Sequence, residues 1–102
     1  MVDPSFRVTP LDGGALGLAG ELDMASAPLL EAELERLPSG DRRSFDLAEL
    51  TFVDSSGLNA FSRYARSLNG QGPLVLANVP DSIANLLELV GFDQLKTIEI
   101  RR

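Results

Sequence analysis

The spacing of apolar residues changes in the middle of the chain. Phe52 and Val53 end an apolar run and are expected to close a buried strand. After a polar stretch, apolar residues recur at offsets of three, seven and ten, which is the spacing of one helical face. These residues are Leu58, Phe61, Ala65 and Leu68. The pattern predicts a strand ending at residue 53, a turn over residues 54–57, and a helix that stops at Asn69-Gly70.

The N-terminal segment predicts a β-hairpin. Phe6–Val8 and Ala15–Leu18 are expected as strands, and Asp12-Gly13-Gly14 between them is a turn sequence that tolerates positive φ. The glycines at positions 13, 14, 17 and 20 do not have the spacing of a dinucleotide-binding or phosphate-binding loop, and no Gly-Lys-Ser or Gly-Lys-Thr follows them. Hairpin geometry therefore explains these glycines better than nucleotide binding does.

A helix is expected to follow the hairpin. Ser26 is its expected N-cap, Pro28 suits the first turn, and Pro38-Ser39-Gly40 ends it. Its apolar face is formed by Leu30, Leu34 and Leu37. The glutamates at positions 31, 33 and 35 lie on the remaining surface, where we expect a solvated acidic face and no metal site.

The second half of the chain predicts further strands and another helix. Ser44–Leu47 is expected as the strand that leads towards the central turn, although it is shorter and more polar than a buried parallel strand usually is. Pro73–Ala77 and Thr97–Ile100 are expected as two more strands. Gly91 closes the helix that lies between them. The apolar stripe of this helix is formed by Ile83, Leu86, Leu87 and Val90.

This order of elements predicts an α/β fold. Strands separated by helices need crossover connections and form a largely parallel sheet, to which the opening hairpin adds one antiparallel pair. We expect a mixed, mostly parallel sheet of about four to five strands, with an N-terminal hairpin and about four flanking helices. The turn over residues 54–57 then lies at the carboxyl end of a strand, where open α/β sheets commonly place their functional sites.

Length and charge narrow the class of protein. At 102 residues and 44% hydrophobic composition, the chain suits one compact domain over residues 1–102. Its 15 acidic and 9 basic residues give a net charge of −6, which disfavours direct binding to nucleic acid. The absence of cysteine excludes disulfides and thiolate metal sites. The N-terminus lacks a signal-like segment and no apolar run is long enough to cross a membrane, so we expect a cytoplasmic protein.

Three interpretations compete for Asp54-Ser55-Ser56. A helix cap is the simplest, because a Ser or Asp oxygen can accept a hydrogen bond from the first free N–H groups of a helix. A catalytic serine is disfavoured, because the chain contains no His and no Cys and lacks a Gly-x-Ser-x-Gly motif. A regulatory phosphorylation site needs only a hydroxyl that a kinase can reach. The residues alone leave the cap and the phosphorylation site open.

Three segments carry a resemblance to a known family. They are Gly20-Glu21-Leu22-Asp23 before the first helix, the stretch from Leu50 to Leu58 with its Asp-Ser-Ser-Gly, and the stretch from Asn78-Val79-Pro80 through Leu86 to Phe92. Taken together, the chain resembles a single STAS domain of the bacterial anti-sigma factor antagonist (anti-anti-sigma factor) family. The resemblance covers nearly all of the chain and implies a mixed sheet with helices packed mainly on one face.

The resemblance implies a binding protein in a partner switch rather than an enzyme. The unmodified form would bind an anti-sigma factor that is also a serine kinase, and would thereby release the sigma factor for transcription. Phosphorylation of Ser55, with Ser56 as the secondary candidate, would end this binding, and a phosphoserine phosphatase would restore it. No cofactor, metal, membrane or nucleic acid is implied as a partner, and the free protein is expected to be a monomer.

The expected partner-binding residues gather at the central turn. They are Asp23, Asp54, Ser55, Ser56, Gly57, Leu58 and Asn59. Asp54 would orient the Ser55 hydroxyl and the turn, and Gly57 would let the partner's backbone approach closely. Only the resemblance places Asp23 near this turn. Asn59 departs from the family pattern, in which glycine is common at this position, and the larger side chain would affect which partner is accepted.

Two alternative functions remain open. A related STAS domain can be an accessory subunit of a membrane lipid-transport complex, and co-purification with a transporter ATPase would distinguish this role from binding to a serine kinase. A nucleotide-binding STAS module is the second alternative. The absence of a phosphate-binding loop argues against it, and tight binding of ATP or GTP would favour it.

Overall fold

The computed structural model describes residues 6–36, 43–68, 70 and 72–102. The strands are β1 (Phe6–Pro10), β2 (Ala15–Leu22), β3 (Ser44–Val53), β4 (Leu74–Ala77) and β5 (Ile98–Ile100). The helices in this part of the chain are α1 (Ala27–Arg36), α2 (Ser55–Ser67) and α3 (Asp81–Leu89), with short 3-10 helices η1 (Asp12–Gly14) and η2 (Phe92–Gln94). The expected helix end at residues 37–40 and the expected stop at Asn69 lie outside the described residues.

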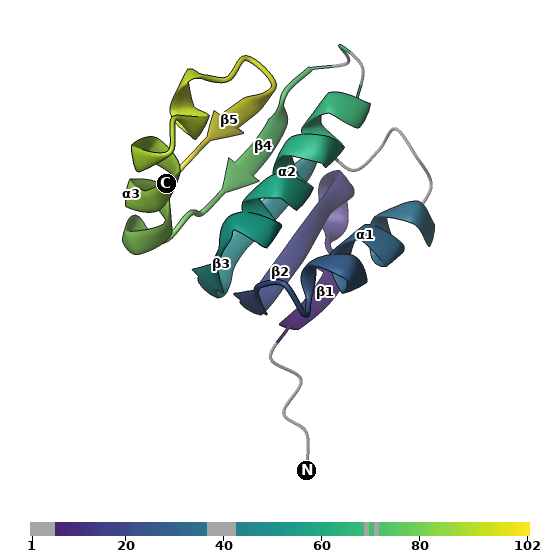
Figure 1. The fold of residues 1–102 in the computed structure, drawn as a ribbon. Helices are drawn as coiled ribbons and strands as arrows, with labels where there is room; N and C mark the ends of the chain where they lie inside the picture. Colours follow the sequence, from purple (N-terminus) through teal and green to yellow (C-terminus); the bar gives the residue numbers. More distant parts are fainter. Residues whose placement is uncertain (1–5, 37–42, 69, 71) are drawn as a thin grey trace.

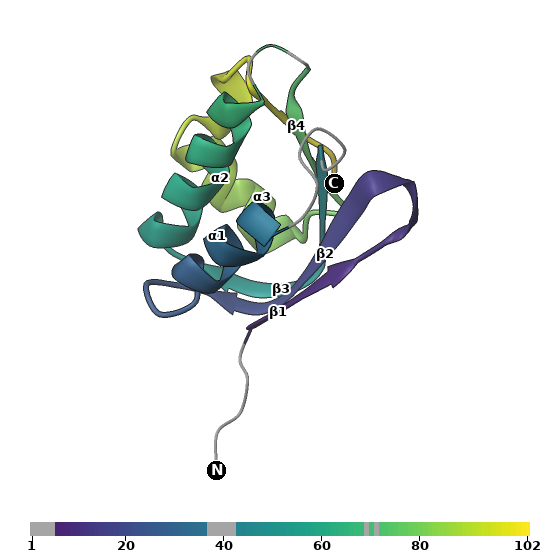
Figure 2. The same cartoon turned by 90° about the vertical axis from the view of Figure 1, so that its right-hand side faces the viewer.

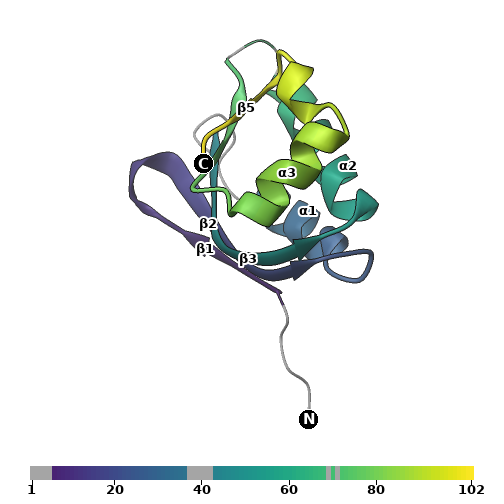
Figure 3. The ribbon, with the colours of Figure 1, turned by 90° about the vertical axis from the view of Figure 1, so that its left-hand side faces the viewer.

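The five strands form one sheet in chain order, β1-β2-β3-β4-β5 (Figure 1). β1 is antiparallel to β2, and each later strand is parallel to its predecessor. Because the crossovers all step in the same direction with the usual right hand, the α-helices lie on one face of the sheet, as Figures 2 and 3 show. The mixed, mostly parallel sheet with its N-terminal hairpin is confirmed. About four flanking helices were expected, and the described residues contain three α-helices and two 3-10 helices.

The hydrophobic core lies between the sheet and the helices. Phe45 of β3 is fully buried, and its ring centroid lies 5.7 Å from that of Phe61 and 5.5 Å from that of Tyr64, both on α2. The predicted apolar face of α2 is confirmed, because Phe61, Ala65 and Leu68 are buried and Leu58 packs against the same core. This packing holds α2 against the sheet. Only Asp54 separates the end of β3 from the start of α2.

β3 is longer than the sequence predicted. It runs for 10 residues, whereas a strand over Ser44–Leu47 was expected. Its register against β2 shifts twice, so that β3 carries one extra residue between Asp46 and Glu49 and another between Leu50 and Phe52. Each extra residue changes the face that the following side chains occupy. Phe52 is consequently 48% exposed, and the prediction that it is buried was wrong, whereas Val53 is buried as expected.

The buried stripe of α3 ends before the sequence predicted. Ile83 and Leu87 are buried as expected, but Val90 is 47% exposed. Val90 follows the last helical residue, and Gly91 then closes the helix with a φ of 86°, so the chain leaves the helical path before Val90 can reach the core. No helix in the described part of the chain has the length and apolar character needed to cross a membrane.

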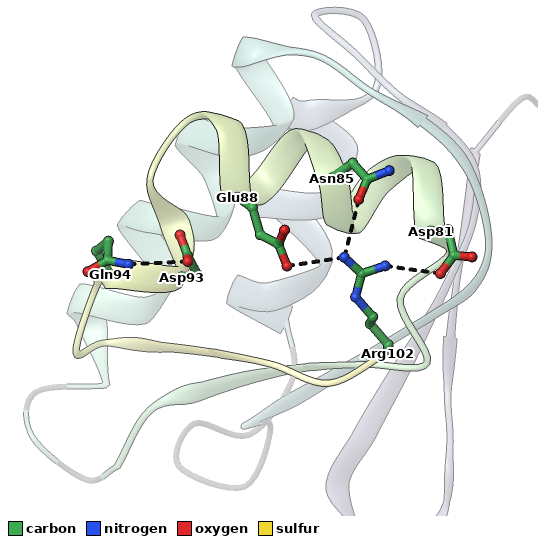
Figure 4. A network of polar contacts seen from close by, with 6 residues as sticks. All are labelled: Asp81, Asn85, Glu88, Asp93, Gln94 and Arg102. Carbon is green, nitrogen blue, oxygen red and sulfur yellow. Dashed lines mark hydrogen bonds and ion pairs between the residues drawn. The ribbon is translucent and has the colours of Figure 1, made fainter.

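The C-terminal segment ties α3 to the edge of the sheet. The Arg101 N–H donates to the carbonyl of Leu76 at 2.8 Å, and the Arg101 carbonyl accepts from the Val79 N–H at 3.0 Å. Figure 4 shows the guanidinium of Arg102 beside three side chains of α3. It donates to Asp81 at 3.0 Å, Asn85 at 3.2 Å and Glu88 at 3.1 Å. Exposed pairs of this kind add little stability individually, but they hold α3 in one orientation against the chain end.

Candidate functional site

Asp54 is the N-cap of α2. One carboxylate oxygen, Oδ1, accepts hydrogen bonds from the N–H groups of Ser56 at 2.8 Å and Gly57 at 3.2 Å. The Asp54 carbonyl accepts from the Leu58 N–H at 3.0 Å, which is the first bond of the helix. These contacts satisfy donors that would otherwise lack partners at the start of a helix. The cap is therefore the aspartate, and the serines follow it.

The two serines occupy the first two positions of α2. Ser55 is exposed and Ser56 is half-buried. Within the described residues, neither hydroxyl makes a hydrogen bond, so the carboxylate of Asp54 orients the backbone of the turn and does not bond the Ser55 hydroxyl. The Ser55 hydroxyl is thus the more accessible of the two to an approaching protein.

Gly57 lies in the first turn of α2 and is buried. A β-carbon at this position would lie 2.6 Å from Val53 Cγ2 and 2.7 Å from Leu22 Cγ, which is closer than real β-carbons come. The space next to Gly57 is therefore filled by the sheet, and the expectation that it receives the backbone of a partner was wrong. The glycine instead lets α2 approach the ends of β2 and β3.

Asp23 lies next to the central turn because β2 and β3 end side by side. Leu22 pairs with Val53 in the sheet, and the N–H of Asp54 donates to the Leu22 carbonyl at 3.1 Å. The turn from β2 into α1 therefore lies at the same end of the sheet as the turn from β3 into α2 (Figures 1 and 2). The structure brings Asp23 and Asp54 to the same edge, in agreement with the resemblance.

The carboxylate of Asp23 is engaged within its own turn. Oδ1 accepts from the N–H groups of Ala25 and Ser26, both at 3.0 Å, and lies 3.0 Å from the Ser26 hydroxyl. Hydrogen bonds from Ser26, first from its N–H and then from its hydroxyl, lower the pKa of Asp23. The Ser26 hydroxyl accepts from the Asp23 N–H at 2.8 Å and lies 2.7 Å from the Glu21 carbonyl. Ser26 occupies the predicted N-cap position of α1, since its carbonyl accepts from the N–H groups of Leu29 and Leu30. Its hydroxyl, however, bonds residues before the helix and not the free N–H groups of the first turn.

The two turns carry carboxylates and hydroxyls but no cation. Residues 21–27 and 53–59 include Glu21, Asp23 and Asp54 and contain no Lys or Arg. The chain contains no histidine, so the serines lack the imidazole base that activates a hydrolytic serine. Among the described residues, no group of His, Cys, Asp or Glu side chains is placed to hold a metal ion. The arrangement presents an exposed serine hydroxyl with no imidazole base beside it.

Comparison with known proteins identifies the family. The sequence profile of the family described as "Mlab, STAS domain" matches residues 7–99. The anti-sigma-B factor antagonist of Listeria monocytogenes is 34% identical over 87 residues, which make up 82% of this chain and 75% of that protein. The chain belongs to the STAS family of anti-sigma factor antagonists.

Solved structures share the fold of this STAS domain. The crystal structure of an anti-sigma factor antagonist from Mycobacterium paratuberculosis has a TM-score of 0.74 at 21% identity and covers 97% of this chain and 90% of that one. The Bacillus cell fate determinant SpoIIAA in its phosphorylated form has a TM-score of 0.62 at 19% identity, with coverage of 93% and 89%. At sequence identities of this size, these structures establish the fold. The function has to be inferred from the residues of the site.

The STAS domain also exposes apolar side chains at this edge that the sequence pattern did not single out. Met24, in the turn between β2 and α1, is 77% exposed, and Leu29, in the first turn of α1, is 56% exposed. On α2, Leu58 is half-buried and Asn59 is exposed. Apolar residues carry no local signal for exposure, because burial depends on what packs above them. The edge therefore combines an exposed hydroxyl with exposed apolar surface.

Proposed function

We propose that this STAS domain is an anti-sigma factor antagonist controlled by phosphorylation. Its unmodified form binds an anti-sigma factor that is also a serine kinase, and the sigma factor is released. Phosphorylation of Ser55 ends the binding, and a phosphoserine phosphatase restores it. The domain acts as a substrate and a binding partner in this cycle and not as a catalyst. It works as a monomer in the cytoplasm, without contact to nucleic acid or membrane, and one domain extends over residues 1–102.

The observation that carries this proposal is the placement of Ser55. Its side chain is exposed at the first position of α2, immediately after a cap that fixes the backbone of the turn. A kinase needs an accessible hydroxyl of this kind, and it brings its own catalytic base. Ser56 is half-buried at the next position and is the secondary candidate. The names of the relatives support an anti-sigma factor as the partner.

Phosphorylation ends the binding by changing the contact surface. A phosphate carries about −1.5 to −2 charges at pH 7, and a helix N-terminus attracts negative charge by about 0.3–1 kcal/mol. The turn therefore tolerates the phosphate, and unfolding does not cause the release. On Ser55 the phosphate stands beside the carboxylate of Asp54, and the two turns contain no cation that would pair with it. Removing these charges from water in an interface is costly, so the complex dissociates.

The test begins with capture of the partner. The wild-type chain, immobilised, is exposed to native cytoplasm, and the retained protein is identified, purified and incubated with the wild-type chain and ATP. We expect a serine kinase that adds one phosphate, located on Ser55 by mass mapping. Ser55→Ala should abolish the modification and keep the binding, while Ser56→Ala should be modified normally. A phosphate found on Ser62 or Ser67 of α2 contradicts the site, and retention of no kinase contradicts the function.

A second candidate function is an accessory role in a lipid-transport complex. It is favoured by the description of the matching family profile, which names Mlab. The same capture experiment separates the two roles, since a retained transporter ATPase in place of a serine kinase supports the second. A nucleotide-binding role is tested by calorimetric titration with ATP and GTP, where we expect no heat of binding.

A further inference from the structure

Two apolar side chains of the domain are strongly exposed. Met24 is 77% exposed at the edge that carries Ser55, and Leu89 is 83% exposed at the last residue of α3. α3 follows β4 and lies on the β4–β5 side of the domain, whereas the turn that carries Met24 follows β2 (Figure 1). Leu89, the last residue of α3, is therefore separate from that turn. Because the two residues have similar exposure but different surroundings, Leu89 serves as a control position for substitutions of Met24.

The turn that carries Met24 is held rigidly. The carbonyl of Asp23 accepts from the N–H groups of Ser26 at 3.1 Å and Ala27 at 2.8 Å, and the Asp23 carboxylate bonds the N–H groups of Ala25 and Ser26. Ser26 is buried, with 4% of its surface exposed, and its hydroxyl donates to the Glu21 carbonyl. This bond ties the turn to the end of β2. Met24 therefore has an ordered backbone beneath an exposed side chain. A partner that buries Met24 therefore restricts the rotamers of this side chain but does not have to order the backbone of the turn.

The turn that carries Met24 lies at the same end of the sheet as the proposed kinase-binding turn. Leu22 and Val53 are paired, so Met24 and Ser55 each stand two residues beyond the same pair at the end of the sheet. Figure 2 shows the turn from β2 into α1 projecting at the end of the sheet where α2 begins. Leu29, also exposed, extends the apolar surface onto the first turn of α1. A protein that binds over Ser55 at this end of the sheet is therefore in a position to contact Met24 and Leu29 as well.

We infer that Met24 is the apolar anchor through which the domain binds the anti-sigma factor kinase, seated in an apolar pocket of that partner. The inference rests on the proposed function and extends it, because it names a binding determinant outside the Asp54-Ser55-Ser56 turn. A few central side chains usually carry most of the binding energy of an interface, and apolar anchors do so by leaving water. The unbranched thioether of Met adapts to an irregular pocket. Asp23 is then a positioning residue that presents Met24.

The test compares three variants in titration calorimetry against the purified kinase. Met24→Gln keeps the length of the side chain and makes it polar, and we expect at least tenfold weaker binding, about 1.4 kcal/mol. Met24→Leu stays apolar and should bind within a few-fold of the wild type, on the order of 1 kcal/mol or less. Leu89→Gln is the control, an equally exposed apolar residue separate from that turn, and should bind normally. All three should keep the thermal midpoint of the wild type, because the side chains are exposed.

The possible failures are distinguishable. Normal binding of Met24→Gln, or equal weakening by Leu89→Gln, overturns the inference while the proposed function stands. If analytical ultracentrifugation shows that the wild type self-associates and that only this association is lost in Met24→Gln, the occupant of the surface is a second copy and the inference is wrong. If the wild-type chain binds no kinase, the proposed function fails first, and the inference fails with it.

Discussion

A β-carbon on Gly57 would lie 2.7 Å from Cγ of Leu22, so the first turn of α2 rests directly on the end of β2. Val53, at the end of β3, closes the same space from the other side, at 2.6 Å. The glycine is consequently a packing requirement of the domain, placed two residues after the proposed phosphorylation site. This contact couples the position of Ser55 to the core.

Gly57→Ala is expected to destabilise the fold. The added methyl group must displace Leu22 and Val53, and overpacking of this kind typically costs about 1–3 kcal/mol, while the better helix propensity of Ala returns up to about 1 kcal/mol. The net loss of unfolding free energy should be about 1–2 kcal/mol, measured by urea denaturation. Asn59→Ala, at an exposed position of the same helix, is the control and should be neutral or slightly stabilising. A stable Gly57→Ala variant shows that the sheet can yield at this point.

Asp54→Asn is expected to preserve the fold and slow the phosphorylation of Ser55. Asn accepts the same hydrogen bonds from the Ser56 and Gly57 N–H groups, so the cap remains, whereas the charge beside Ser55 is removed. Asp54→Ala, which loses the cap as well, should lower the unfolding free energy by about 0.5–2 kcal/mol. Thermal denaturation and initial rates with purified kinase and ATP measure the two effects. Phosphorylation of Asp54→Asn at the wild-type rate means that Asp54 acts only as a cap.

Ser55→Asp is expected to weaken binding to the anti-sigma factor by at least tenfold, about 1.4 kcal/mol. Unit charges about 4 Å apart repel by about 1 kcal/mol in water and by roughly 4 kcal/mol in a partly desolvated interface. The increase on binding, for a second carboxylate beside Asp54, is enough for this effect. The thermal midpoint should stay near that of the wild type, because a helix N-terminus favours negative charge. Ser55→Asn has the same size without the charge and should bind more tightly than Ser55→Asp. Equal weakening by both variants points to steric bulk, and a much lower midpoint for Ser55→Asp points to a conformational switch.

Asp23 is expected to make stability depend on pH in the acid range. Hydrogen bonds from Ser26 lower the pKa of Asp23 in the folded chain, so the unfolded chain binds the proton more readily. The stabilisation is fully present above the ordinary pKa of about 4, and it is lost as the pH falls through the lowered value. The thermal midpoint of the wild type should therefore exceed that of Asp23→Asn at pH 6, and the difference should shrink below about pH 4. Glu35→Gln, on the exposed surface of α1, controls for the loss of one carboxylate and should show no such trend.

Local turn chemistry was readable from the sequence. Asp12-Gly13-Gly14 was expected to turn the chain, and Gly13 and Gly14 adopt φ of 77° and 83° between the two paired strands. A turn over residues 54–57 was expected to lead into a helix, and the helix α2 follows but already begins at Ser55. These features depend on backbone preferences and hydrogen bonds within a few residues, which the order of residues contains directly.

The sequence named residues of the candidate site but did not give their arrangement. The sequence singled out Asp54 and Ser55, but it left open which of them caps the helix, since both residue types do so. The carboxylate of Asp54 reaches two N–H groups, and this settles the cap. Met24 was not identified at all, because an apolar residue in a turn looks the same in sequence whether it is buried or exposed.

The sequence by itself determined where the chain turns, which segments become strands and helices, and which polar residues stand at the central turn, because these follow from interactions between neighbours. Only the tertiary structure decided that Phe52 faces solvent, that Gly57 is closed off by Leu22, and that the turns carrying Met24 and Ser55 follow paired strand ends. Those outcomes depend on the register of β2 against β3 and on how α2 packs against the ends of these two strands. The residues involved are far apart in the chain and meet only when the sheet has formed.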